Sequence, residues 1–248
     1  MKLFYFLHSL LVLLVAPVLT LLVSVIALIW LEIFRRSDDE AHRLVRYWGK
    51  ALCVISGVRV KIEGMENLVP GRSYIFAANH QSQYDIITLQ GYLDFSFRWL
   101  AKKELFQVPI WGTAMKMAGY IPIDRSSGRQ ALKSLDQAAK RIAAGTSVII
   151  FPEGTRSVDG KLQPFKAGAM VLAIKAGVEL VPIAISGTYT ILPKGRLLLH
   201  PGRVLIRIGK PISTDGYQTK QKIELAMQLQ QEVASLLDQE ASPAGKAS

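Results

Sequence analysis

The sequence predicts an α/β domain, a sheet covered by helices, preceded by a membrane segment. Two observations predict the sheet: short β-rich runs recur after residue 57, and stretches with helical periodicity alternate with them. A third observation predicts the membrane segment, because most of the hydrophobic excess falls within the first 32 of the 248 residues. A chain of this length suits one domain plus such an appendage.

The N-terminal segment carries no formally charged residue from Leu3 to Leu31. It is longer than the ~20 residues that a helix needs to cross a bilayer. A cleavable signal peptide would have a shorter apolar region and a small-residue cleavage site, which the run from Leu31 to Arg36 does not provide. Pro17 lies in the middle, so the sequence leaves open one kinked, tilted helix or a shallow re-entrant hairpin.

Charge predicts the orientation and the class of partner. Only Lys2 and the terminal amine precede the apolar segment, whereas several cations follow it: Arg35, Arg36, Arg43, Arg46 and Lys50. This excess predicts that the chain after the apolar segment lies on the cytoplasmic side of the cell (inner) membrane. The net charge of +11 indicates an anionic partner. An anionic membrane surface is favoured and no nucleic acid is expected, because no basic run is interleaved with exposed aromatic residues.

A second helix is expected from Asp38 to about Ile55, with three acidic residues in its first turn. It either packs on the globular domain or lies on the membrane with Trp48 at headgroup depth. We assign residues 1–57 to membrane-embedded and interfacial helices, 58–240 to one globular domain, and the small, polar stretch 241–248 to a disordered tail. Cys53 is the only cysteine, which excludes an internal disulfide and a multi-cysteine metal site.

The strands and helices of the globular domain follow from apolar runs and their boundaries. The expected strands are apolar and mostly bounded by Gly, Pro, Asp or Asn: 58–62, 74–78, 98–101, 120–123, 147–151, 180–185 and 204–208. The expected helices lie between or after them: 85–92, 110–118, 129–144, 167–176 and 223–237. Gly145 and Gly177 are natural C-terminal caps for two of these helices.

A histidine and an aspartate stand five residues apart where the strand 74–78 ends and a helix begins. In open α/β sheets, sites collect at such strand exits. One helical turn can bring Asp85 back onto the imidazole of His80, where it would hold the Nδ1 proton and leave Nε2 free as a general base for a hydroxyl. The alternative is a helix-capping aspartate beside a histidine with no catalytic role.

Two further strand exits carry arginine. The sequence Phe-Pro-Glu-Gly-Thr-Arg-Ser, residues 151–157, supplies a tight turn, a carboxylate, hydroxyls and a guanidinium suited to phosphate. Asp124 and Arg125 follow the strand 120–123; taken alone, they could be a surface ion pair of little energetic value. Beside a His-Asp pair in the same sheet, two such arginines favour a substrate with both a phosphate and a hydroxyl.

No Gly-x-Ser-x-Gly nucleophile elbow, Walker-type loop or dinucleotide glycine loop is present in the sequence. Direct attack by an acceptor hydroxyl is therefore expected in preference to an acyl-enzyme intermediate.

Taken together, the motifs resemble those of the glycerolipid acyltransferases, most closely the 1-acylglycerol-3-phosphate branch. Residues 79–85 are similar to the family's His-x4-Asp motif, and the second, third and short fourth motifs match residues 119–125, 151–157 and 181–183. Lys102 and its neighbours also resemble the segment between the first two motifs. The matching order and spacing extend over about 110 residues, which makes the combination specific although each motif alone is weak.

The resemblance implies a mixed α/β sheet of the glycerolipid acyltransferase type, covered by helices, with an N-terminal membrane helix or two-helix motif. It implies transfer of an acyl chain from acyl-CoA or acyl-carrier protein to the sn-2 hydroxyl of 1-acylglycerol-3-phosphate, giving phosphatidic acid in phospholipid biosynthesis. His80 would be the base and Asp85 its orienting partner. The implied substrate-binding residues are Lys102, Asp124, Arg125, Glu153, Gly154, Thr155 and Arg156. No metal and no cofactor beyond the acyl-thioester co-substrate are implied.

Three rivals stay open at the level of sequence. The acceptor could be glycerol-3-phosphate or a different lysophospholipid. A membrane-anchored lipid hydrolase could use the same His-Asp pair to activate water. A non-catalytic lipid-binding protein would keep its function when His80 is replaced.

Overall fold

The computed structural model describes residues 2–124 and 126–239. Its centre is a seven-stranded sheet in the order β1-β7-β6-β2-β5-β3-β4. All neighbouring pairs are parallel except β6 and β7, which are antiparallel, so the implied mixed sheet is confirmed. The strands are β1 Val58–Glu63, β2 Tyr74–Ala78, β3 Arg98–Lys102, β4 Ile121–Ile123, β5 Val148–Ile150, β6 Glu179–Ser186 and β7 Gly202–Ile208.

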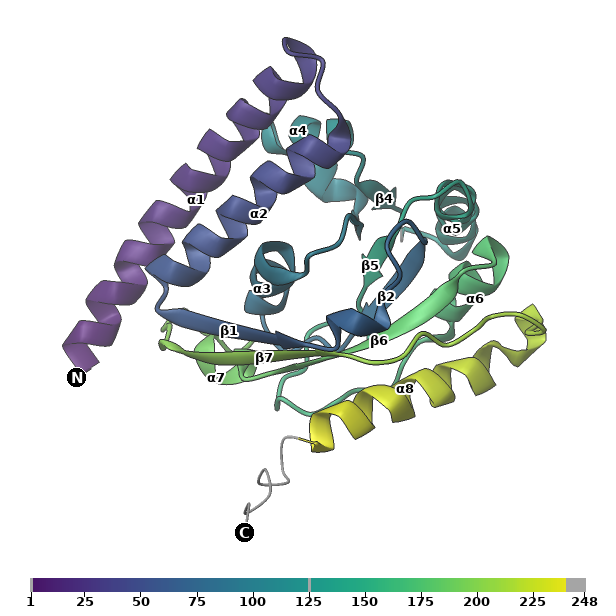
Figure 1. The fold of residues 1–248 in the computed structure, drawn as a ribbon. Helices are drawn as coiled ribbons and strands as arrows, with labels where there is room; N and C mark the ends of the chain where they lie inside the picture. The colour runs from purple at the N-terminus through teal and green to yellow at the C-terminus, as the bar shows by residue number, and fades with distance from the viewer. Residues whose placement is uncertain (1, 125, 240–248) are drawn as a thin grey trace.

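Helices cover both faces of this sheet (Figure 1). They are α1 Lys2–Glu32, α2 Asp38–Ile55, α3 Tyr84–Tyr92, α4 Trp111–Met117, α5 Gly128–Ala143, α6 Ala167–Ala176, α7 Thr188–Ile191 and α8 Lys222–Asp238. Helices α5, α6 and α8 share one core with Ile75 and Ala77 of β2, and α3 shares the other with Phe76. Every residue of β2 is fully buried, which explains why this strand is a continuous apolar run rather than an alternating one.

The expected strands and helices of the globular domain are all present, each within two residues of the bounds read from the sequence. Gly177 caps α6 with φ of 63°, in the left-handed region where a side chain would be strained. The stretch 241–248, expected to be a disordered tail, lies outside the described residues.

Helix α1 runs without interruption through Pro17, so the structure has a single helix here and no re-entrant hairpin. By length and composition, α1 is the one helix within residues 2–124 and 126–239 that could cross a membrane. Its buried residues, Ser9, Val12, Ser24 and Ala27, fall on one face. Leucine, valine and phenylalanine side chains on the rest of its surface are exposed.

Helix α2 lies antiparallel to α1 and also packs against α3 (Figure 1). Ser37 and Glu40 close a capping box at its start. The indole of Trp48 donates a hydrogen bond of 3.0 Å to Thr20 of α1, and Nε2 of His8 lies 2.9 Å from the carbonyl oxygen of Ile55. Of the two arrangements left open, the structure shows α2 packed on the domain, with Trp48 turned to α1.

The crossing of α2 and α3 brings two backbones into contact. A Cβ atom on Gly49 would lie 2.7 Å from the backbone nitrogen of Gly91, and one on Gly91 would lie 2.9 Å from that of Lys50. These distances are shorter than any normal carbon–nitrogen contact. Glycine at both positions therefore permits the close approach that holds the two N-terminal helices on the sheet.

Candidate active site

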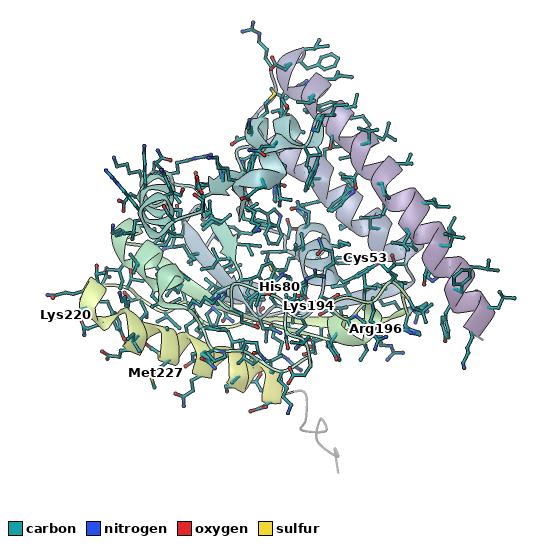
Figure 2. The ribbon with its side chains drawn as sticks, turned by 180° about the vertical axis from the view of Figure 1, so that it is seen from behind. Cys53, His80, Lys194, Arg196, Lys220 and Met227 are labelled. Carbon is teal, nitrogen blue, oxygen red and sulfur yellow. The ribbon has the colours of Figure 1, made fainter. Side chains whose placement is uncertain are left out.

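The predicted site residues that the structure describes lie at one edge of the sheet. Strands β2, β5, β3 and β4 are parallel neighbours, so their carboxyl ends meet at the same edge. His80 follows β2, Glu153 follows β5, Lys102 ends β3 and Asp124 follows β4. This arrangement is the one expected of a site at strand exits in an α/β sheet. Figure 2 shows the side chains, with His80 near the middle of the molecule.

The His-Asp pair is formed. Nδ1 of His80 lies 2.8 Å from Oδ2 of Asp85, which sits in the first turn of α3 and is fully buried. The same oxygen accepts the backbone N–H groups of Gln81 at 2.7 Å and Ser82 at 2.8 Å. A carboxylate oxygen that accepts hydrogen bonds needs a donor on the imidazole as well. Nδ1 is therefore the protonated ring nitrogen, and Nε2 carries the free lone pair. The prediction that one helical turn joins the two groups is confirmed.

A third residue holds the aspartate. The hydroxyl of Thr188 donates to Oδ1 of Asp85 at 2.5 Å, and Thr188 is fully buried. It opens α7 directly after Gly187, whose φ is 90°. No sequence signal pointed to Thr188, because only the pairing of β2 with β6 brings it beside Asp85.

The imidazole of His80 is fixed from several sides. It stacks on the ring of Phe151 at 3.9 Å between centroids. The backbone N–H of His80 donates to Oε1 of Glu153 at 2.8 Å, and the backbone carbonyl of His80 accepts the N–H of Ser157 at 2.7 Å. The side-chain amide of Asn79 pairs with both backbone groups of Ile185, at 2.7 and 2.9 Å. The first and third motifs therefore form one unit around the imidazole.

Glu153 is buried, with only 2% of its surface exposed. Burial is the main cause that raises the pKa of its carboxyl to about 7. The hydrogen bond from the N–H of His80 lowers this pKa, and the charge of Asp85 raises it further. Its Oε2 atom has no hydrogen-bond partner within the described residues. The contact seen for Glu153 is thus with the backbone of His80, and its expected contact with a substrate stays a prediction.

The loop after β5 presents the other residues of the third motif. Gly154 has φ of 76°, and a Cβ atom there would lie 2.9 Å from Nζ of Lys166. Arg156 is half-buried, and none of the ion pairs between described residues uses its guanidinium. Nζ of Lys194 donates to Oγ1 of Thr155 at 3.2 Å and to the carbonyl of Arg156 at 3.1 Å. Lys194 was not among the predicted site residues, because only the tertiary fold brings it to this loop.

The second motif lies farther along the same edge. Asp124 pairs with Lys103 at 3.0 Å and accepts the N–H of Ser126 at 2.9 Å. The hydrogen bonds from Ser126, together with Lys103, lower the pKa of Asp124 to about 2. Lys102 is exposed at the end of β3, and Arg125 lies outside the described residues. The structure thus brings Asp124 to the site edge, but pairs it with Lys103.

The geometry suits deprotonation of a hydroxyl, and Ser82, the serine two residues after His80, is not placed to act as a nucleophile. Ser82 is fully buried, and its hydroxyl donates to the carbonyl of Leu192 at 2.7 Å. A hydroxyl held in this way cannot turn towards a carbonyl substrate. Direct attack by an acceptor hydroxyl stays a prediction.

Comparisons with known proteins identify the family. The acyltransferase family model matches residues 59–186. The chain is 39% identical over 173 residues to a chloroplastic 1-acyl-sn-glycerol-3-phosphate acyltransferase of Arabidopsis thaliana, covering 69% of this chain and 48% of that protein. It is 37% identical to a chloroplastic enzyme of the same name from Brassica napus, over 73% of this chain and 53% of that one. The chain spans about half the length of these curated relatives.

A solved structure is similar over nearly the whole chain. The crystal structure of the 1-acyl-sn-glycerophosphate (LPA) acyltransferase PlsC from Thermotoga maritima aligns with a TM-score of 0.73 and 28% sequence identity. The alignment covers 95% of this chain and 100% of that one. Together with the match of the family model over more than half of the sequence, these findings show that the chain belongs to the acyltransferase family.

Proposed function

We propose that this protein transfers an acyl chain from acyl-CoA or acyl-carrier protein to the sn-2 hydroxyl of 1-acylglycerol-3-phosphate, giving phosphatidic acid in phospholipid biosynthesis. The observation that carries the proposal is the pair of His80 and the buried Asp85, 2.8 Å apart at a strand exit. The names of the relatives and of the aligned structure support the same acceptor.

The proposed reaction follows from this geometry. Nε2 of His80 accepts the proton of the sn-2 hydroxyl while the oxygen attacks the thioester carbonyl. The tetrahedral intermediate collapses, the carbon–sulfur bond breaks, and the thiolate takes the proton back from the imidazolium. Asp85 stabilises the transient positive charge on His80. The thioester is already activated, so the reaction needs no metal and no cofactor.

Binding of the acceptor phosphate is assigned to the cations of the strand exits. Arg156 supports this assignment because its charge is left unpaired by the described residues. Arg125 and Lys102 would add to it, while Gly154, Thr155 and the carboxylates Glu153 and Asp124 shape the glycerol site. A guanidinium can hold a phosphate by two parallel hydrogen bonds.

Helix α1 is proposed to attach the domain to the cytoplasmic face of the cell membrane. Both of its halves contact the domain, through Ser9 near one end and through α4 near the other. A helix held in this way cannot stand perpendicular to the bilayer with the domain wholly outside. We therefore place α1 within one leaflet, with its exposed leucine and phenylalanine side chains among the lipid chains.

The test is an acyl-transfer assay with purified protein, labelled acyl-CoA or acyl-carrier protein, and a panel of acceptors. We expect phosphatidic acid from the lysophosphatidic acceptor, and little product from monoacylglycerol or glycerol-3-phosphate. Arg156→Lys should raise KM for this acceptor by about tenfold or more, with a smaller effect on the donor, because lysine cannot form the bidentate contact. Thioester hydrolysis without acceptor acylation would instead indicate a hydrolase.

A further inference from the structure

The segment between α7 and β7 lies in a basic stretch of the chain and exposes leucine side chains. No acidic residue occurs between Glu179 and Asp215, whereas this stretch holds five lysine and arginine residues. Within it, residues 194–198 form a loop of sequence Lys-Gly-Arg-Leu-Leu. Leu197 is 71% exposed and Leu198 is 41% exposed, and Arg196 is exposed beside them. Two adjacent exposed leucines next to cations are unusual on a surface that only water contacts.

The loop is tied at one end to α1. The backbone N–H of Leu199 donates to Oγ of Ser9 at 2.7 Å, and the ring of His200 packs edge-on against Tyr5 at 4.8 Å between centroids. Its leucines therefore lie next to the N-terminal half of α1, where Phe4 and Phe6 are exposed. Exposed apolar side chains thus occur on both sides of this contact between α1 and the loop.

The other end of the loop reaches the active site. Lys194 donates to Thr155 and to the carbonyl of Arg156. The next residue after these two, Ser157, donates its backbone N–H to the carbonyl of His80. Figure 2 shows Lys194 beside His80, with Arg196 farther towards α1. A single short loop thus connects the apolar helix with the residues assigned to the acceptor phosphate.

We propose that loop 194–198 is a second membrane contact, which inserts Leu197 and Leu198 among the headgroups of an anionic bilayer and binds lipid phosphate through Arg196. Charge and continuity with α1 support this partner: cations beside exposed apolar side chains suit the interface of an anionic membrane. A soluble acidic protein, such as a carrier protein, would match the charge of the loop but not its exposed leucines. This inference rests on the proposed attachment of α1 to the membrane.

The test measures contact with lipid by fluorescence quenching. Cys53 is fully buried, and burial raises the pKa of its thiol to about 12, so a single introduced cysteine can be labelled selectively. The label is placed by Leu197→Cys, and by Met227→Cys as a control. Met227 is similarly exposed, at 67%, but lies on α8, across the molecule from α1 (Figure 2). The full-length protein is reconstituted in phosphatidylglycerol-containing vesicles with a lipid-bound quencher.

We expect the label at 197 to be quenched and the label at 227 to stay bright. Equal quenching at both positions, or at neither, would overturn the proposal. A third label, from Leu14→Cys on the exposed surface of α1, reports attachment separately. Quenching at 14 without quenching at 197 refutes the loop contact alone, whereas loss of both refutes the membrane attachment on which it rests.

The charge of Arg196 is tested in the same system. Arg196→Glu should weaken binding of the loop to anionic vesicles at least about fivefold, seen as lost quenching at 197, because each basic residue near such a surface contributes about this factor. Lys220→Glu is the matched control, since Lys220 is exposed in the short 3-10 helix Thr219–Gln221 just before α8. If Arg196→Glu leaves the quenching intact, or Lys220→Glu abolishes it equally, the assignment of lipid phosphate to Arg196 is wrong.

Discussion

At the scale of single residues, the site is defined by the groups that fix the imidazole and backbone of His80. Asp85 holds Nδ1, Phe151 stacks on the ring, and Glu153 binds the backbone N–H. The sequence could predict His80 and Asp85 because five residues separate them. It could not predict Thr188, which binds Asp85 from 103 residues away through the packing of two strands.

Replacing His80 with alanine should abolish acyl transfer and leave the fold intact. The change removes the general base, a contribution of roughly 10²–10⁴-fold in rate, while the imidazole contributes only one face to the stack on Phe151. Initial rates with the lysophosphatidic acceptor, with circular dichroism as the folding control, provide the measurement. A variant within tenfold of the original rate would exclude His80 as the base.

Stability should depend on pH through Glu153. An acid whose pKa is raised on folding, here from 4.5 to about 7, binds more protons in the folded than in the unfolded state. Its contribution is therefore full at low pH and is lost as the pH rises from about 4.5 to 7. Glu153→Gln removes this titration, so the fall in thermal midpoint between pH 5 and pH 8 should be smaller than in the unaltered protein.

The control for this experiment is Glu66→Gln, at an exposed position in the chain. It removes one negative charge without touching the site. If both variants show the same pH dependence as the original protein, Glu153 does not titrate in this range.

At the scale of elements, periodicity and boundary residues were sufficient to predict the strands of the sheet and the α-helices longer than about one turn. The strand 74–78 and the helices 38–55 and 167–176 have the predicted bounds. Helix α7 has four residues, too few for a periodic pattern, and was not predicted. The packing of α2 was left open for a different reason. Its contact with α3 depends on Gly49 of α2 and Gly91 of α3, which lack side chains and so let the two backbones approach closely.

Substituting alanine at Gly49 should destabilise the protein. The new methyl group would meet the backbone of Gly91, which cannot move away without shifting α3, and overpacking of this kind costs typically about 1–3 kcal/mol. Gly168→Ala, in α6 with open space around it, is the matched control and should be neutral or stabilising by up to about 1 kcal/mol. Thermal unfolding in one detergent compares the two. Equal midpoints would show that α2 and α3 separate easily.

At the scale of the whole molecule, the sequence predicted the membrane segment and the catalytic domain, but not how they fit together. Hydropathy measures how apolar a helix is, and α1 is long and apolar enough to cross a bilayer. In our proposal α1 does not cross the bilayer, because residues far apart in the sequence hold it against the rest of the protein. Ser9 binds Leu199, and Trp48 binds Thr20.

Both ends of α1 should therefore be accessible from the same side of the membrane. Single cysteines from Lys2→Cys and Phe34→Cys, both at exposed positions, are treated with an impermeant thiol reagent outside sealed vesicles. We expect the two to react to the same extent, in either vesicle orientation. If one cysteine reacts only from one side of the membrane and the other only from the opposite side, α1 crosses the bilayer. The placement in one leaflet would then be wrong.

The order of strands in the sheet has a consequence for synthesis on the ribosome. The central strand β2 is fully buried between β5 and β6, and β6 ends 108 residues after Ala78, at Ser186. At about 5–20 residues per second, an apolar strand waits roughly 5 to 20 s for its second partner. Helices α1 and α2 are complete long before, so the nascent chain can be at the membrane while its sheet is still open. Asn79, His80 and Asp85 are made early, but Ile185 and Thr188, which hold them, arrive among the last third of the chain. Translation that stops before that point yields a chain that contains His80 and Asp85 but lacks the residues that hold them in place.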